Sequence, residues 1–154
     1  MKILVSACLL GIPCRFDGKS KEYDIAPIMS HDIVPFCPEC YGGLPIPRAP
    51  SEILNRRVVS SIGTDVTKQF QKGAQSAVLL CQKLGIRYAL LKSKSPSCGS
   101  GQIYDGTFGK ILIDGDGITA EALKKIGVRV YAEQELALLL NDITSEESVE
   151  SPIR

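Results

Sequence analysis

Apolar runs of strand length recur along the chain, and helical patterns lie between the later ones. The runs cover residues 1–7, 32–36, 86–92 and 128–131. Helical periodicity covers residues 64–84, 119–126 and 133–140. Strands that alternate with helices favour a mostly parallel sheet with helices on its faces. We therefore predict a single-domain α/β fold, a Rossmann-like three-layer sandwich over residues 1–143, and a polar, flexible C-terminal tail over residues 144–154.

The helix over residues 64–84 has the most regular pattern. Thr64 or Asp65 can cap its start, and Gly85 stops it. Spacings of three and four residues place one apolar stripe along it, formed by Val66, Phe70, Ala74, Ala77, Cys81 and Leu84. Cys81 is therefore predicted to be a core residue.

Three segments rich in glycine, proline and serine are predicted to be loops: 8–21, 37–50 and 93–101. Between them, residues 22–30 fit a short helix that Pro27 weakens. Pro35 likewise weakens the strand predicted over residues 32–36. Residues 108–113 alternate apolar and polar positions, which fits a strand or a hairpin arm.

Composition narrows the classes of function. The chain has 18 basic and 17 acidic residues and a net charge of +1, so we expect no nucleic acid polymer as a partner. A small anionic ligand needs only a few placed cations. No apolar run approaches the ~20 residues of a membrane helix, and residues 1–5 read as a strand instead of a signal peptide. We expect a cytoplasmic protein, a monomer or small homo-oligomer, without a membrane partner.

The cysteines are the most informative side chains. Cys8 and Cys37 each directly follow an apolar run, and Cys98 lies in the loop after the run at 86–92. If these strands are parallel, the three thiols meet at one edge of the sheet, where ligands bind in such folds. In a reducing compartment disulfides are improbable, so metal ligation, thiol chemistry or burial remains.

Two further thiols leave a zinc alternative open. Cys37 and Cys40 form a C-x-x-C pair, and Cys14 lies in the first loop. There is no second C-x-x-C, and His31 is the sole histidine, yet a four-thiolate zinc site can draw on these five loop cysteines. The alternative function is a zinc- or thiol-based binding or redox module without catalysis.

A third hypothesis makes Cys8 a nucleophile. Cys8 and Arg15 are separated by six residues. The phosphate loop of low-molecular-weight tyrosine phosphatases has the same two ends with one fewer residue between them. An extra residue in so tight a loop disturbs the ring of amides around a phosphate, which argues against this activity.

Three segments carry a resemblance to a known family. They are VSACLLGIPCRFDGKSK (5–21), CPECYGGLPIPRAPSEI (37–53) and LLKSKSPSCGSGQIYDG (90–106). In this order they resemble the three motifs of the thiouracil desulfidase family, and the likeness extends over most of residues 1–140. It implies a 4Fe–4S cluster bound by three cysteines, which match Cys8, Cys37 and Cys98. Cys14 and Cys40 fall where other members can carry apolar residues, so the resemblance gives them no ligand role.

The implied chemistry is consistent with these residues. Thiolates are the usual ligands of iron–sulfur clusters, and three of them leave one of four irons open. An open metal site can act as a Lewis acid, and iron has affinity for sulfur. The expected substrate is a thiolated pyrimidine, as 4-thiouracil or 4-thiouridine monophosphate. Its C=S becomes C=O with release of sulfide, without net redox change.

Loop residues near these cysteines supply candidates for the other roles. Glu39 is the candidate general acid or base, and Ser95 the candidate hydroxyl that binds substrate or passes a proton. The candidates for substrate binding are Arg15, Arg48, Lys94 and Ser97. The alternatives are ordinary ones, namely surface charges for the cations, a loop-capping carboxylate for Glu39 and turn hydroxyls for the serines.

Overall fold

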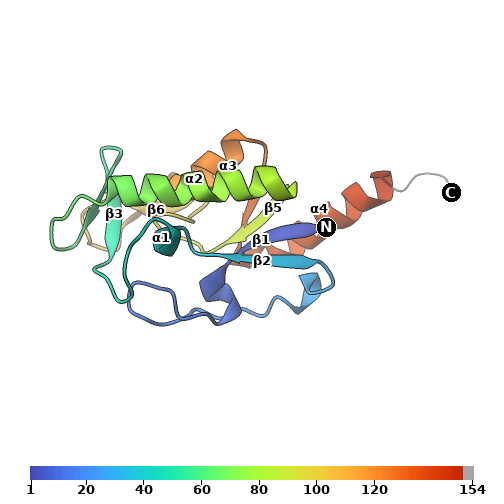
Figure 1. Ribbon diagram of the computed structural model, residues 1–154, viewed down its shortest axis with the longest axis horizontal. Helices are drawn as coiled ribbons and strands as arrows, with labels where there is room; N and C mark the ends of the chain where they lie inside the picture. Colours follow the sequence, from blue (N-terminus) through green and yellow to red (C-terminus); the bar gives the residue numbers. More distant parts are fainter. Residues whose placement is uncertain (151–154) are drawn as a thin grey trace.

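A four-stranded parallel sheet forms the centre of the computed structural model, which describes residues 1–150 (Figure 1). Its strand order is β2-β1-β5-β8, and every neighbouring pair is parallel. The strands are β1 (Lys2–Ser6), β2 (Asp32–Phe36), β5 (Tyr88–Leu91) and β8 (Arg129–Ala132). These are the four strands that the apolar runs predict, so the α/β fold class is confirmed.

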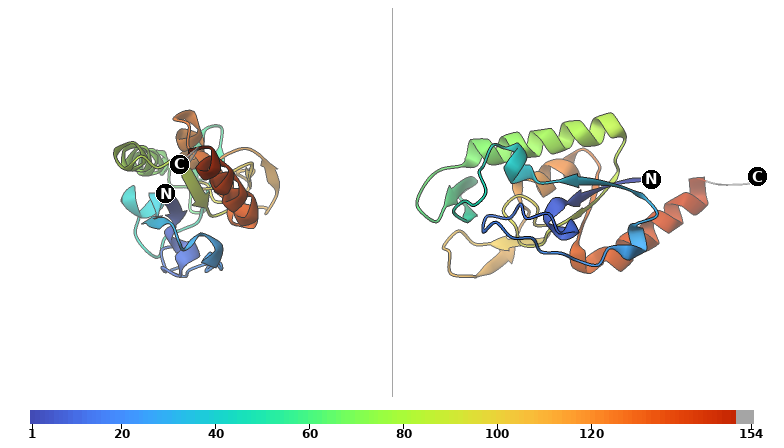
Figure 2. Two further views of the ribbon diagram at one scale, coloured as in Figure 1. Left: turned by 90° about the vertical axis from the view of Figure 1, so that its right-hand side faces the viewer. Right: turned by 60° about the horizontal axis from the view of Figure 1, so that its bottom comes forward.

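Helices cover both faces of this sheet, as Figures 1 and 2 show. The alternation of side chains along a strand divides the core into two halves. Leu4, Ala89 and Leu91 pack with helices α2 (Thr67–Leu84) and α3 (Ile118–Lys125). Ile3 and Leu90 lie in the opposite core cluster, with helix α4 (Leu136–Glu150) and the segment after β1. The predicted three layers are therefore present.

Cys81 lies in the core under α2, with 2% of its surface exposed. Burial raises the pKa of its thiol to about 11. The prediction of a core position for Cys81 is confirmed.

Two antiparallel hairpins lie beyond the carboxyl ends of the parallel strands, at the left of Figure 1. One joins β3 (Ser51–Leu54) to β4 (Arg57–Ser60), and the other joins β6 (Gln102–Tyr104) to β7 (Leu112–Asp114). The second contains part of the hairpin arm predicted over 108–113. The first was not predicted, because its turn is made by Asn55 and Arg56, both with positive φ, without the usual glycine.

Several boundaries differ from the predictions. The helix predicted over 22–30 is wrong, since only Ala26–Ile28 form a short 3-10 helix with Pro27 in its first turn. The loops after β1 and β2 begin with one helical turn each, a 3-10 helix over Ala7–Leu10 and α1 (Pro38–Tyr41).

The final helix α4 begins at Leu136 and continues to Glu150, beyond the predicted end at residue 140. It therefore includes most of the predicted tail, and residues 151–154 of that tail lie outside the described part of the chain. Among the described helices, none is long and apolar enough to cross a membrane.

The short helix α1 is held against α2 by direct backbone contact. A Cβ atom on Gly73 of α2 would lie 2.0 Å from the carbonyl oxygen of Pro38, and one on Gly42 would lie 2.0 Å from that of Gln69. Neither position has room for a side chain. Because Pro38 follows Cys37 directly, this contact also fixes where that thiol leaves the sheet.

We predict that Gly73→Ala destabilises the protein by about 2–3 kcal/mol, as overpacking of a core does. Alanine is otherwise the better helix former by about 1 kcal/mol, so a loss must come from the contact with Pro38. Urea unfolding measures it, with Gln75→Ala, at an exposed position of the same helix, as the control expected within about 0.5 kcal/mol of wild type. An unchanged or higher midpoint for Gly73→Ala would contradict the packing.

Candidate active site

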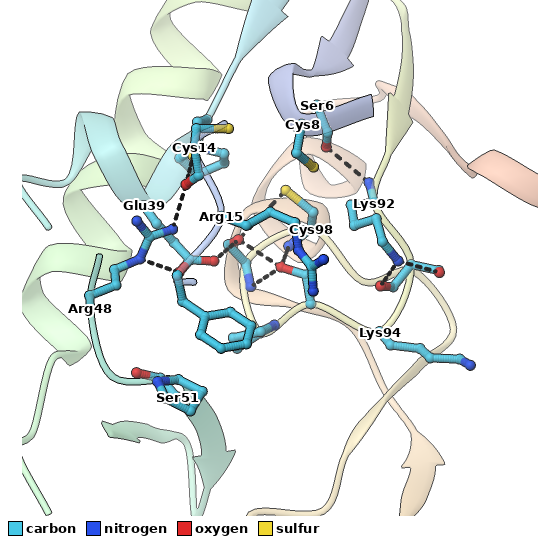
Figure 3. A pocket seen from close by; sticks show the side chains of 18 of the residues that line it. Ser6, Cys8, Cys14, Arg15, Glu39, Arg48, Ser51, Lys92, Lys94 and Cys98 are labelled. Atoms are coloured by element: carbon cyan, nitrogen blue, oxygen red, sulfur yellow. Dashed lines mark hydrogen bonds and ion pairs between the residues drawn. The ribbon is translucent and has the colours of Figure 1, made fainter. Parts of the chain in front are cut away.

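A cavity of about 420 Å³ opens at the carboxyl ends of β1, β2 and β5 (Figure 3). The loops after these strands form most of its wall, and the two hairpins contribute the rest. All nine predicted site residues line it: Cys8, Arg15, Cys37, Glu39, Arg48, Lys94, Ser95, Ser97 and Cys98. The structure thus brings together residues that lie as much as 90 positions apart in the chain.

The three candidate ligand thiols come from three different loops. Cys8 and Cys98 are buried, Cys37 is half-buried, and all three are free thiols. Figure 3 shows the sulfur atoms of Cys8 and Cys98 pointing toward one another. Burial raises the pKa of Cys98 to about 12, and a hydrogen bond with Cys14, followed by burial, raises that of Cys37. These two thiols are therefore protonated near neutral pH without a metal, and metal binding would release their protons.

Cys14 and Cys40 differ in their relation to the cavity. Cys14 is buried and lines it, whereas Cys40 is not among the described residues that do. The backbone carbonyl of Cys14 accepts hydrogen bonds from the thiols of Cys37 and Cys40, each at 3.8 Å. A hydrogen bond with Cys37 lowers the pKa of Cys14, but one with Cys8 and burial outweigh it and raise the pKa to about 11. Burial raises the pKa of Cys40 to about 11 as well.

Thiolates are ligands both of zinc and of iron–sulfur clusters, and the two kinds of site differ in how far apart the ligands lie. A zinc site needs four ligands about 2.3 Å from one point if all are thiolates. Within residues 1–150, no three His, Cys, Asp or Glu side chains gather closely enough to hold one metal ion. A 4Fe–4S cluster places its thiolates farther apart, because each binds a different iron. Cys8, Cys37 and Cys98, around one cavity, supply such a donor set.

The first loop does not form a phosphate cradle around Cys8. Its amides bond to carbonyls of the protein, with Gly11 N–H donating to Cys8, Ile12 N–H to Ala7, and Arg15 N–H to Lys19. A phosphatase loop needs such amides free to point at its ligand. This geometry supports the argument from spacing against Cys8 as a phosphatase nucleophile.

Glu39 lies in α1, two residues after Cys37, and both of its carboxylate oxygens have partners. Arg48 donates from Nε to Oε1 at 3.1 Å, and Ser97 donates from Oγ to Oε2 at 2.9 Å. The other guanidinium nitrogens of Arg48 donate to the carbonyls of Cys14 at 3.0 Å and Pro45 at 3.1 Å. The guanidinium of Arg48 thus has three partners within the protein. Substrate binding by Arg48 stays a prediction.

Ser95 and Ser97 shape the loop that carries Cys98. The hydroxyl oxygen of Ser95 accepts the N–H groups of Ser97 and Cys98, each at 3.1 Å, and lies 2.9 Å from the hydroxyl of Ser97. The turn is preceded by Lys94 in the left-handed conformation, with φ of 66°. Ser95 therefore makes the bonds of an ordinary turn hydroxyl, whereas the hydroxyl of Ser97 bonds Glu39, and both serines line the cavity.

Cations and aromatic rings line the remaining wall. Arg15 lies over the ring of Phe16, at 5.5 Å from its centroid, and is 3.9 Å from Asp17 in a partly exposed pair. Sequence reasoning missed Lys110 and the aromatic residues Tyr104 and Phe108. They lie in or beside the β6–β7 hairpin, and no local pattern shows that this hairpin folds over the cavity.

Lys92 is a further residue that the sequence analysis missed, although its place at the end of a strand was a usable signal. Its Nζ lies 3.0 Å from Glu133, which is 5% exposed. The other carboxylate oxygen of Glu133 accepts the N–H of Ser93 at 2.7 Å. This buried pair fixes the start of the loop that leads to Cys98.

Comparison with known proteins gives consistent results. The model of the 2-thiouracil desulfurase family matches residues 3–135. The curated protein YbbK of Bacillus subtilis (strain 168), described as uncharacterized, is 39% identical over 153 residues, which cover 92% of this chain and 99% of the relative. A solved structure of the 4Fe–4S-dependent thiouracil desulfidase TudS is 45% identical, with a TM-score of 0.90 over 93% of this chain and 97% of that one.

We predict that Glu133→Gln lowers the free energy of unfolding at pH 7 by about 2 kcal/mol. Breaking a fully buried pair costs about 3–5 kcal/mol, and this pair is weaker because the Lys92 side chain is 18% exposed. The control is Glu121→Gln, which breaks a surface pair with Lys125 and should change stability by about 0.5 kcal/mol or less.

The same variant should show a defined pH dependence. Burial alone would raise the pKa of Glu133, but the backbone N–H groups of Glu133 and Ser93, with Lys92, outweigh it and hold the pKa below 4.5. A lowered pKa stabilises the fold above the unfolded value and stops doing so as pH falls through the folded value. The difference between wild type and Glu133→Gln should therefore shrink below pH 4.5 in unfolding curves. A constant difference would contradict this assignment.

Proposed function

Since the chain belongs to the 2-thiouracil desulfurase family, we propose that it removes sulfur from a thiolated pyrimidine with a 4Fe–4S cluster held by Cys8, Cys37 and Cys98. The observation that carries the proposal is the convergence of these thiols, from three separate loops, on one cavity. The same cavity holds a carboxylate and two hydroxyls that can exchange protons.

The three cysteines would hold the cluster, and Cys98 is the most deeply buried of them. When bound, the cluster supplies an iron without a protein ligand, which is a Lewis acid with affinity for sulfur. The thiols of Cys37 and Cys98 give up their protons on binding, since thiolates are the ligands.

We propose that the reaction is hydrolytic. A C=S group and water become a C=O group and hydrogen sulfide, so no electrons are gained or lost. Water must lose both of its protons, and the departing sulfur must receive two to leave as hydrogen sulfide. Glu39 and Ser95 both line the cavity, and we propose that they move these protons.

The finer proposal concerns the substrate. A cavity of about 420 Å³ lies within the range of small-molecule sites, and in this proposal the cluster and the substrate share it. Arg15, Lys94 and Lys110 line the wall, and Lys94 and Lys110 have no ion-pair partner in the described part of the chain. Such cations fit the phosphate of 4-thiouridine monophosphate better than the neutral base. The near-neutral net charge supports a small molecule over a nucleic acid polymer.

We predict that anaerobic reconstitution with iron and sulfide gives a brown protein that releases sulfide from 4-thiouracil or its nucleoside monophosphate. Broad visible absorbance, iron analysis and sulfide assay test this, and the nucleotide should have the higher kcat/KM. A colourless protein that contains zinc, or a reconstituted protein without sulfide release, would contradict the proposed function.

The cysteine roles predict a clear contrast. Cys98→Ala should lose both the cluster absorbance and the activity, because it removes one of three ligands. Cys81→Ala is the matched control, since Cys81 is equally buried but lies in the core under α2. It should keep both properties, with a stability loss of about 1 kcal/mol for the lost packing. Retention of a full iron complement by Cys98→Ala would overturn the ligand assignment.

A further inference from the structure

The carboxylate of Glu39 is fixed from two sides by buried groups. Arg48 holds Oε1 with a side chain that is 6% exposed, and Ser97, 1% exposed, holds Oε2. The Glu39 side chain is itself 16% exposed. Figure 3 shows Arg48 and Glu39 on the side of the cavity opposite Lys92. The position of the carboxylate is therefore set by the protein before any substrate enters.

The number of available hydrogens gives this network a direction. A serine hydroxyl has one hydrogen, and that of Ser97 has two acceptors within reach, Glu39 Oε2 at 2.9 Å and Cys98 Sγ at 3.6 Å. The carboxylate takes it, because it is the closer acceptor and carries a charge. The 2.9 Å contact between the two serine hydroxyls must then be donated by Ser95. Ser95 in turn accepts the N–H groups of Ser97 and Cys98. The hydrogens point from Ser95 through Ser97 to Glu39.

Protonation of Glu39 reverses this direction. The acid then donates to Ser97, and Ser97 donates to Ser95, whose two backbone donors at 3.1 Å then share one lone pair. The hydrogen of Ser95 is released from Ser97 and can be donated to a group in the cavity, which Ser95 lines. We infer that Ser97 relays a proton between Glu39 and Ser95, and that Arg48 is the residue that positions Glu39 for this relay. The inference rests on the proposed function.

The transfer balances without a co-reactant. Glu39 gives its proton to Ser97, Ser97 gives its own to Ser95, and Ser95 gives its own to the acceptor. Both serines end as hydroxyls, Glu39 ends as a carboxylate, and the acceptor gains one proton. The reverse sequence returns Glu39 to the acid.

Ser97 is held in place for this role by α3. Its carbonyl accepts the N–H groups of Thr119 and Ala120 at 2.9 and 3.1 Å. A Cβ on Gly117 would lie 2.5 Å from the carbonyl carbon of Ser97, so the two backbones are in direct contact. A relay needs donor and acceptor held within hydrogen-bond reach, and this packing provides it.

Arg48 links three parts of the site. Besides Glu39, it binds the carbonyl of Cys14 in the first loop and that of Pro45 in its own. A guanidinium presents donors in a fixed plane, which suits simultaneous contact with several acceptors. Lysine cannot reproduce this geometry, so Arg48→Lys should behave as a loss of the contact.

The test compares Ser97→Ala, Ser95→Ala and the double variant in reconstituted protein, with Ser76→Ala as the matched control. Ser76 also bonds a carbonyl, that of Lys72, but lies on α2 away from the cavity. Because Ser97 Oγ lies 3.6 Å from Cys98 Sγ, rates are expressed per cluster after iron analysis. Calorimetry of uracil binding shows whether a variant has lost contact with the pyrimidine, which loss of the relay alone would not cause.

We expect kcat of Ser97→Ala to fall about 100-fold, the lower end of the range for proton-transfer groups, with KM and uracil affinity within about threefold of wild type. The double variant should be no slower than the slower single variant, because the two hydroxyls act in series. An unchanged kcat, additive losses, or a loss of uracil affinity that accounts for the loss of rate would each overturn the relay.

A second readout needs neither cluster nor activity. In crystals of cluster-free Ser97→Ala, Glu39 should stay on Arg48 with Oε2 unbonded to residue 97, whereas in Arg48→Lys the carboxylate should move. An unmoved Glu39 in Arg48→Lys would overturn the positioning role. An inactive wild-type protein would overturn the proposed function and the relay together, whereas an active wild type with unimpaired Ser97→Ala would overturn the relay alone.

Discussion

The parallel pairing of β1 with β2 on one side and β5 on the other is the constraint on which the site depends. Ser6 lies opposite Phe36, and Val5 opposite Leu90, so these strands end at the same edge. Cys8 and Cys37 follow within two residues, which leaves their thiols little freedom to lie elsewhere. A shift of one strand by one residue would turn its side chains to the other face of the sheet and move its cysteine away.

Strand pairing alone does not place Cys98, because it lies seven residues beyond the end of β5. Its loop is fixed from two other directions. Helix α3 receives the carbonyl of Ser97 at its first amides, and the buried Lys92–Glu133 pair holds the start of the loop. The three thiols thus converge through two kinds of constraint, and the second requires segments that lie more than 20 residues further along the chain.

This difference explains how much could be predicted. Hydrophobic runs predict the four strands, and strand ends predict that Cys8, Cys37 and Cys98 lie at one edge of the sheet, because both rules are local or follow from sheet geometry. The contacts that fix the loop of Cys98 do not follow from these rules. The pairing of Arg48 with Glu39 and the link from Ser97 to Glu39 depend on how one loop folds over another. No periodicity records such contacts. The β3–β4 hairpin escaped prediction for another reason, since Asn55 and Arg56 adopt positive φ where the sequence carries no glycine.

The charges around the cavity divide by burial, and this division bears on what the site can bind. The deep charges occur in pairs, Arg48 with Glu39 and Lys92 with Glu133, as the cost of burying a single charge requires. Lys94 and Lys110 are exposed, so water solvates them and no partner is needed. A group that enters the cavity therefore meets neutralised charge at its base and free cations at its outer wall. This arrangement fits a molecule with an uncharged ring and an anionic substituent, oriented with the ring toward the thiols.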